Sequence, residues 1–385
     1  MKCSIKKILT NKELALVLNL VGFSLLRGLW VIIPQFSLLI LASYMMVLCL
    51  CVGLSSVDIH KILLLIGAVF LSLLMEYLFR TTPYLFEHLY LFMIYGAIPI
   101  YLVSKIKKAD EVLRFYAYAS LVLFFLYFRA PFQKTLIFSN YMDFGFNFGI
   151  PTYLGIHVGR TYLKKKWFLI FEGILIGILL VFANRSVMLT IILVNGFSFF
   201  REKNVSKKMG LFLFFGLIGG MGIFYLKELT INLVIFLESH HYSSYAMRQL
   251  LNLVQTGNRV SFFSGRFGLW QDALAMFRLN PIFGQGTGAF YMRYGKDTHN
   301  LIFDLAVQYG GVGVVLFFIL VGVATVGVIK SKQESEKVLG CLFLCMWFPK
   351  LFLSSSLFKE SGIWLYIAYG IMLKMRYSKT QSEGS

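Results

Sequence analysis

The sequence contains little charge and little cysteine. Charged residues make up 14% of its 385 residues and hydrophobic residues 58%, and the mean hydropathy is +0.73. Soluble domains carry about 25% charged residues, so this composition argues against a soluble protein with a single membrane anchor. Four of the five cysteines lie inside apolar runs and none has the spacing of a zinc site. We therefore expect neither disulfides nor a bound metal.

Acidic residues are scarce as well. The chain has 18 Asp and Glu against 37 Lys and Arg, which gives a net charge of +19. In a soluble protein this excess would indicate nucleic-acid binding, but in a membrane protein it follows from the retention of Lys and Arg in cytoplasmic loops. We therefore expect no nucleic-acid partner. The sequence also lacks an internal repeat and a small-residue cleavage site after the first apolar run, so we expect no cleaved signal peptide.

Apolar runs recur along the whole chain and predict an all-α polytopic membrane protein. A bilayer core needs ~20 residues per helix, and several of the runs are shorter than this. The weakest run, 144–159, contains Asn147, Pro151 and His157. The twelve runs fall at about 14–33, 36–54, 62–79, 89–103, 112–128, 144–159, 167–182, 187–200, 211–226, 301–329, 338–353 and 361–373.

The distribution of Lys and Arg supports this count. With the amino terminus inside, 22 of the 37 fall in inner segments and 12 in outer segments, seven of them in the long outer segment 227–299. Long loops cross the membrane regardless of their charge. We therefore predict about twelve transmembrane helices with both termini in the cytoplasm. The predicted regions are transmembrane helices 1–9 (1–226), an extracytoplasmic catalytic loop with short helices (227–299), and helices 10–12 with a cytoplasmic tail (300–385).

The outer segment contains one predicted surface helix. Ser264 is a candidate N-cap and Pro281 ends the helix. An apolar stripe at helical spacing indicates that the helix lies on the membrane surface or packs on the bundle. The stripe consists of Phe267, Trp270, Leu274 and Phe277.

A glycine-rich stretch, GQGTGAFYMRYGKDTHN, follows this helix at residues 284–300. Its alternating glycines suggest a nucleotide loop, but a dinucleotide fingerprint needs a preceding strand within a βαβ unit. Here a helix precedes the glycines and the segment lies outside, so nucleotide binding is disfavoured. Two interpretations stay open. The glycines form a flexible turn, or they let backbone N–H groups approach an anion.

Three motifs in order resemble the bacterial O-antigen polymerase and O-antigen ligase family. His299-Asn300 is followed by nine residues, Gly310, two residues and Gly313, which is similar to the family signature. Asn184-Arg185-Ser186 is similar to its Ser/Asn-Arg-small motif. A third run, Arg266, Trp270, Pro281, Gly284, Gly286 and Gly288, also matches. The resemblance covers about residues 180–320. It departs from the family at Gln308, where the family often has Glu.

The resemblance implies metal-independent, inverting glycosyl transfer without a cofactor, on the outer face of the bacterial cytoplasmic membrane. The expected donor is an undecaprenyl-diphosphate-linked oligosaccharide. His299 is the expected base, and the alternative is a histidine that caps its helix. Arg185 and Arg266 are expected to hold the diphosphate; the alternative for Arg185 is snorkelling to headgroups. Asp297 either orients the imidazole or is a solvated carboxylate.

Further residues are expected to bind the diphosphate or the glycan. Charged side chains near the outer ends of spans tend to face a cavity, and Arg27 and Glu76 belong with them in an outward-facing vestibule. The predicted binding residues are Gly284, Gly286, Gly288, Asn300, Arg278, Arg129, Arg80 and Lys350.

Three functions are compatible with this sequence. The first is a polymerase of lipid-linked repeat units that makes a capsule, exopolysaccharide or O-antigen. The second is a ligase that transfers the finished glycan to another acceptor, and the third is a transporter or flippase. A transporter more often has two similar halves. A composition rich in Lys, Phe and Ile leans towards the polymerase, with membrane lipid, a flippase and a chain-length regulator as candidate partners.

Overall fold

The computed structural model describes most of the chain, and every regular element in that part is helical, which confirms the all-α prediction. The predicted span 211–226, Ser264 and Arg80 lie outside the described residues, as does the side chain of Arg27. The described residues are 11–32, 34–53, 60, 63–71, 74, 76, 85–132, 138, 140–201, 228, 230–240, 242, 244–256, 266–353 and 357–382.

The chain forms two compact units, and each is described by itself. The first unit consists of residues 1–119 and 268–385, and the second of residues 120–267. The predicted outer segment 227–299 contributes to both units. Spatial packing therefore divides the chain differently from the predicted order of membrane and loop segments.

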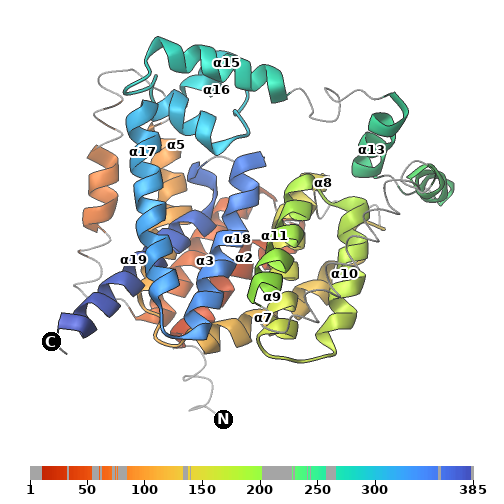
Figure 1. Ribbon diagram of the computed structural model, residues 1–385, viewed down its shortest axis with the longest axis horizontal. Coiled ribbons are helices and arrows are strands. Elements are labelled where there is room, and N and C mark those ends of the chain that lie inside the picture. Colours follow the sequence, from red (N-terminus) through yellow and green to blue (C-terminus); the bar gives the residue numbers. More distant parts are fainter. Residues whose placement is uncertain are drawn as a thin grey trace. The chain divides into compact units, whose positions relative to one another are not determined.

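The core of the first unit is a set of packed helices (Figure 1). Helices α17, α18 and α19 pack on one another, and α19 also packs on α6. Gly327 and Gly370 let the backbones of α17 and α19 touch, because a Cβ at either glycine would overlap the backbone of the other helix. The helices are α2 (Lys12–Ile32), α3 (Ser37–Val52), α5 (Leu85–Phe92), η2 (Met93–Ala97), α6 (Ile98–Ser104), α17 (Leu301–Lys330), α18 (Glu334–Leu353) and α19 (Ser361–Ser382).

Two helices of the first unit, Phe86–Ser104 and Leu301–Lys330, are long and apolar enough to cross a membrane, by length and composition. Within the described ranges they alone meet both criteria. Shorter apolar helices cover Leu39–Leu48, Phe168–Phe182, Arg185–Phe199 and Thr230–Ser239. These findings are consistent with a membrane protein and leave the number of spans as a prediction.

The second unit contains the run that was the weakest span in the sequence. Residues 150–159 are all buried within α9. The buried Glu172 accepts hydrogen bonds from Arg160 and lies 2.8 Å from Nδ1 of His157, so a charged cluster joins α9 to α10. The helices are α8 (Tyr141–Phe144), η3 (Gly145–Gly149), α9 (Ile150–Thr161), α10 (Phe168–Phe182), α11 (Arg185–Arg201) and α13 (Tyr245–Thr256). Helix α7 (Ala109–Tyr127) crosses from the first unit into the second.

Helices α15 (Arg266–Leu279) and α16 (Ala289–Tyr294) lie across the amino-terminal end of α17 (Figure 1). Ala273 and Met276 of α15 are buried against α16 and α17. Trp270 stacks on Phe303 of α17, with ring centroids 5.8 Å apart. The predicted surface helix therefore packs on the bundle.

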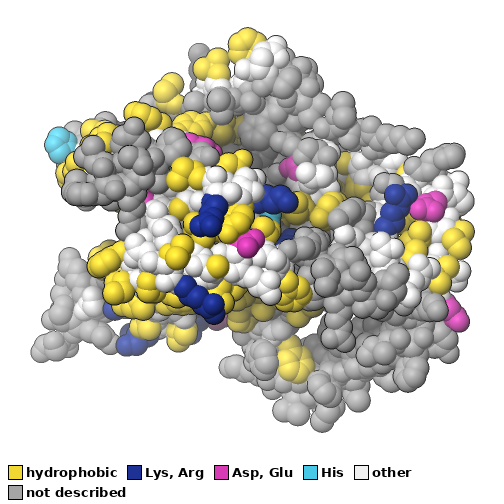
Figure 2. Space-filling model, turned by 90° about the horizontal axis from the view of Figure 1, so that it is seen from above, with side chains coloured by type: hydrophobic (Ala, Val, Ile, Leu, Met, Phe, Trp, Pro, Cys, Tyr) yellow, Lys and Arg dark blue, Asp and Glu magenta, His cyan; other side chains and the backbone are white. Residues whose placement is uncertain are grey.

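The packing face of α15 is offset from the predicted apolar stripe. Phe267 and Leu274, two residues of that stripe, are 45% and 39% exposed. Exposed Leu279, Ile282 and Phe283 follow them. Viewed from above, hydrophobic and basic side chains lie side by side on the visible face (Figure 2). The sequence pattern located the helix correctly but did not reveal which apolar residues it buries.

Candidate active site

His299 has an unusual backbone conformation. Its φ is 54°, and among the described residues only Lys164 is another non-glycine with positive φ. Such conformations cost energy and concentrate at functional sites, because the surrounding structure must impose them. The side chain of His299 is half-buried.

The residues on both sides of His299 fix this conformation. Thr298 is buried, and its carbonyl accepts a hydrogen bond from Nε1 of Trp270 at 3.2 Å. Asn300 caps α17, since its Oδ1 accepts from the backbone N–H groups of Ile302 and Phe303 at 2.9 and 3.3 Å. Its Nδ2 donates to the carbonyl of Phe352. Asn300, a predicted binding residue, therefore has a structural role that its place before an apolar helix also indicates.

Gly310, the first glycine of the signature, breaks α17. Its φ of 68° and ψ of −166° lie in a region that is essentially restricted to glycine. In an unbroken helix, the N–H groups of residues 311 and 312 would bond to the carbonyls of residues 307 and 308. The break therefore leaves four backbone groups without helical partners.

The segment 281–286 supplies partners for all four groups. We call this arrangement, formed by residues 281–286 and 307–312, the loop–helix junction. The loop thereby replaces two helical hydrogen bonds. The bonds run from Gly311 N to Pro281 O (2.7 Å), Val312 N to Ile282 O (3.2 Å), Gln285 N to Val307 O (2.6 Å) and Gly286 N to Gln308 O (2.9 Å).

The loop glycines allow this close approach. Gly284 has a φ of 70°, and a Cβ there would lie 2.5 Å from the backbone of α17. Gly286 and Gly288 also have positive φ. The N–H groups of Gly284 and Gly286 bond to protein carbonyls. An anion at these two N–H groups, one of the two predicted roles, would have to displace those bonds.

A carboxylate holds the next residue of the loop. Both carboxylate oxygens of Glu76 accept hydrogen bonds from Thr287, one from its backbone N–H and one from its hydroxyl, the latter at 2.6 Å. The Thr287 hydroxyl also lies 2.9 Å from the hydroxyl of Tyr309. Glu76 was predicted to line a vestibule, and here it ties the loop to the helices.

We expect Glu76→Gln to loosen this loop. Hydrogen bonds to a charged group contribute about 1.5–3 kcal/mol each, and the substitution removes the charge and one acceptor. Limited proteolysis should therefore cut the stretch 284–300 faster than in the wild type. The matched control is Glu111→Gln, which removes an exposed surface ion pair with Lys108, and such pairs contribute little to stability. Equal cleavage rates in the two variants would contradict this role of Glu76.

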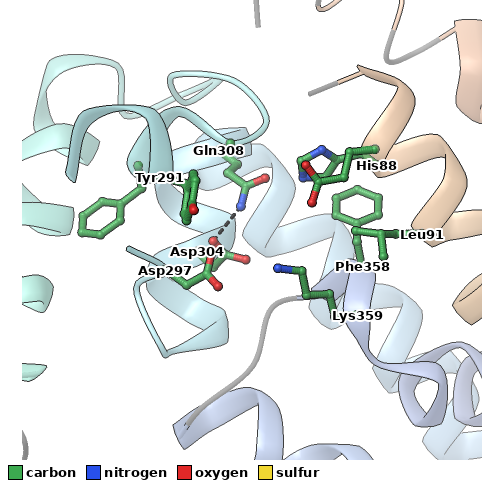
Figure 3. A pocket seen from close by; sticks show the side chains of 11 residues that line it. His88, Leu91, Tyr291, Asp297, Asp304, Gln308, Phe358 and Lys359 are labelled. Carbon is green, nitrogen blue, oxygen red and sulfur yellow. Dashed lines mark hydrogen bonds between the residues drawn. The ribbon is translucent and has the colours of Figure 1, made fainter. Parts of the chain in front are cut away.

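A cavity of about 360 Å³ opens beside the same end of α17 (Figure 3). It lies between α5, α16, α17 and η4 (Leu357–Lys359). Asp297, two residues before His299, lines it, which places this predicted carboxylate at the cavity. The other lining residues are Glu87, His88, Leu91, Gly288, Phe290, Tyr291, Asp304, Gln308, Phe358 and Lys359.

Two buried side chains of α17 lie one turn apart in this cavity. Asp304 and Gln308 are 7% and 8% exposed. Nε2 of Gln308 donates to Oδ1 of Asp304 at 2.6 Å (Figure 3). In the sequence Gln308 was notable only as a departure from the family signature, and Asp304 was not predicted, although a carboxylate four residues into an apolar helix is an indication of function.

Arg185 lies in the second unit, as the first residue of α11. Oδ1 of Asn184 accepts from the backbone N–H of Val187 at 3.1 Å, so the first residue of the predicted motif caps this helix. The guanidinium of Arg185 donates to Oε1 of Gln249 on α13 at 2.8 Å. This contact joins the Asn-Arg-Ser motif to α13, which lies in the predicted outer segment.

Arg266 begins α15 and is half-buried. Burial lowers the pKa of its guanidinium, and the neighbouring Tyr141 raises it. Arginine stays charged at neutral pH despite such shifts. Arg266 therefore brings a partly desolvated positive charge, which suits the binding of an anion.

The remaining predicted cations have different surroundings. Arg278 is exposed in the last turn of α15, where a cation also stabilises the helix end. Arg129 is exposed in the second unit, with its guanidinium 5.3 Å from the ring centre of Phe128. Nζ of Lys350 lies 2.5 Å from Oε2 of the buried Glu360, so a carboxylate already balances its charge.

The first unit brings several predicted residues together at one end of α17: His299, Asn300, the loop glycines and Asp297. Arg185, Arg266 and Arg129 belong to the second unit. A comparison with known protein families finds no match to this chain, and a comparison with curated proteins also finds none. The resemblance to the O-antigen enzymes therefore rests on the residues themselves.

Proposed function

We propose that this protein is a glycosyltransferase of the bacterial cytoplasmic membrane. It joins polyprenyl-diphosphate-linked oligosaccharide repeat units into a surface polysaccharide on the outer face. The proposal includes about twelve spans with both termini in the cytoplasm. It includes the outer location of α15, α16 and His299, a flippase that supplies the substrate, and a chain-length regulator as a further partner.

The main support is the conformation of His299. The residue combines positive φ with a position immediately before a helix N-cap and two residues after Asp297, which lines a polar cavity. A histidine that only capped α17 would not need this conformation, because Asn300 already caps the helix. A polar side chain imposed in a strained conformation beside a cavity is typical of an active site.

His299 acts in this proposal as the general base. It takes the proton of an acceptor hydroxyl, and the acceptor oxygen forms a bond to the anomeric carbon of the donor. The bond between that carbon and the phosphate oxygen breaks, and the polyprenyl diphosphate leaves with the electron pair. Because the oxygen attacks from the opposite side, the anomeric configuration inverts.

Arg185 and Arg266 stabilise the leaving diphosphate. Each guanidinium offers planar paired donors that match phosphate oxygens. Arg266 is half-buried, and a partly desolvated charge stabilises developing negative charge more strongly than an exposed one.

The products distinguish a polymerase from a ligase and from a transporter. A polymerase lengthens the lipid-linked chain by whole repeat units and gives a ladder on a gel. A ligase moves one finished glycan to a different acceptor. A transporter changes the side of the membrane on which the substrate lies and leaves the substrate intact.

We expect the purified protein to lengthen the lipid-linked repeat unit in the presence of EDTA. Arginines supply the positive charge for the diphosphate in this proposal, so no divalent cation is needed. The measurement is the gel ladder with EDTA and with added Mg²⁺ or Mn²⁺. Strict dependence on an added divalent cation would overturn the assignment of Arg185 and Arg266.

A further inference from the structure

The cavity beside α17 has more hydrogen-bond acceptors than donors. Glu87, Asp297 and Asp304 contribute carboxylates, whereas Lys359 contributes an ammonium and His88 an imidazole. Carboxyl groups therefore outnumber the ammonium group by three to one. This balance disfavours phosphate and favours hydroxyl, amide N–H or ammonium groups.

Gln308 adds a buried acceptor atom to which no group in the described part of the chain donates a hydrogen bond. Its Nε2 donates to the carboxylate of Asp304, which orients the amide because a carboxylate accepts. Its Oε1 is buried and has no hydrogen-bond partner among the described residues. In Figure 3 this oxygen turns away from Asp304 and towards the side of the cavity where His88 lies. Buried polar atoms normally find a partner, so a bound ligand would complete this site with a donor.

The cavity also has aromatic walls. Phe358 meets His88 edge to face, with ring centroids 4.9 Å apart. Tyr291 lines the cavity and is 46% exposed. Aromatic rings provide flat apolar surfaces next to the polar groups that orient a ligand. The described residues form no group of three or more His, Cys, Asp or Glu that could hold a metal ion.

We propose that this cavity binds an uncharged or amino-bearing sugar of the acceptor glycan. The sugar ring lies against Tyr291 and Phe358, and its hydroxyl groups donate to Oε1 of Gln308 and to the carboxylate of Asp304. That the sugar belongs to the acceptor rests on the proposed function. The cavity does not suit the diphosphate, because its carboxylates repel the donor's leaving group.

The test uses saturation-transfer NMR on the full chain in lipid nanodiscs. The probes are glucose, galactose, mannose and glucosamine, with inorganic pyrophosphate as the competitor. We expect saturation transfer from the protein to at least one of these sugars. Gln308→Met removes the acceptor Oε1 while keeping the side-chain length. Tyr291→Ala removes the exposed aromatic ring that lines the cavity. Each variant should bind that sugar roughly tenfold more weakly, as expected for the loss of one good contact.

Gln333→Met is the matched control. Gln333 is an exposed glutamine just beyond the other end of α17, and this variant should bind the sugar like the wild type. The proposal would be overturned if none of the four sugars receives saturation transfer from the protein. Unchanged binding in both cavity variants would do the same, as would competition by pyrophosphate.

The same experiment in a His299→Asn background separates this proposal from the proposed function. Sugar binding does not need the base, so it should persist. If the wild type makes no polymer from the lipid-linked repeat unit while the cavity variants lose the sugar, the cavity assignment stands and the proposed function fails. If His299→Asn abolishes polymer while the cavity variants keep the sugar, the cavity assignment fails.

Discussion

The variant His299→Asn should insert into the membrane normally and make no detectable polymer. Asparagine tolerates positive φ better than most residues, so the backbone before α17 keeps its conformation while the base is lost. General-base catalysis contributes about 10²–10⁴-fold in rate, and we expect a loss of that size. The measurement is conversion of lipid-linked repeat unit to a ladder, normalised to the amount of protein.

Lys164, the other described non-glycine residue with a positive φ, provides a matched control. Lys164 has a φ of 55° and is exposed in the second unit, so Lys164→Asn introduces the same residue at a positive φ outside the candidate site. It should keep full activity. Full-length polymer from His299→Asn would remove His299 from the catalytic role, and His299 would then be a structural residue.

The variant Gly310→Ala should lose both stability and activity. An alanine at a φ of 68° and ψ of −166° is strained, and its Cβ would overlap the carbonyl of Ile282. We expect a loss of about 3 kcal/mol or more from strain and overlap together. The loop–helix junction would open, and the conformation of His299 would change with it. The measurements are the midpoint temperature of thermal unfolding in detergent and the conversion of repeat unit to polymer.

Gly322→Ala provides the comparison for this prediction. Gly322 lies in the same helix, and a Cβ there would meet nothing within 4 Å. Its midpoint should equal or exceed that of the wild type, because alanine favours a helix over glycine. An unchanged midpoint and full activity in Gly310→Ala would show that the junction does not need this glycine.

The sequence predicted the helices more successfully than the contacts between them. Long apolar runs determine where a helix forms, so α2, α10 and α17 begin and end within a few residues of their predicted runs. The apolar stripe of α15 was less informative. An apolar residue that faces lipid or another protein cannot be distinguished by periodicity from one that packs inside, and Phe267 and Leu274 are exposed.

The candidate site shows the same limit. His299 and Gly310 could be found because their spacing follows a known signature, but the role of Gly310 depends on a partner segment more than twenty residues earlier in the chain. The bond between Glu76 and Thr287 joins residues 211 positions apart, and local pattern carries no information about such a pair. Asp304 could have been found from its charge within an apolar helix.

The loop–helix junction also makes both parts of α17 depend on segment 281–286. The carbonyls of the two residues at 307 and 308 accept from this segment, and the N–H groups of the two residues that follow Gly310 donate to it. Each part of α17 is therefore bonded to the loop where a regular helix would be bonded to itself. A displacement of the loop would act on both parts at once, because the part that lines the cavity and the apolar part that follows share one point of attachment.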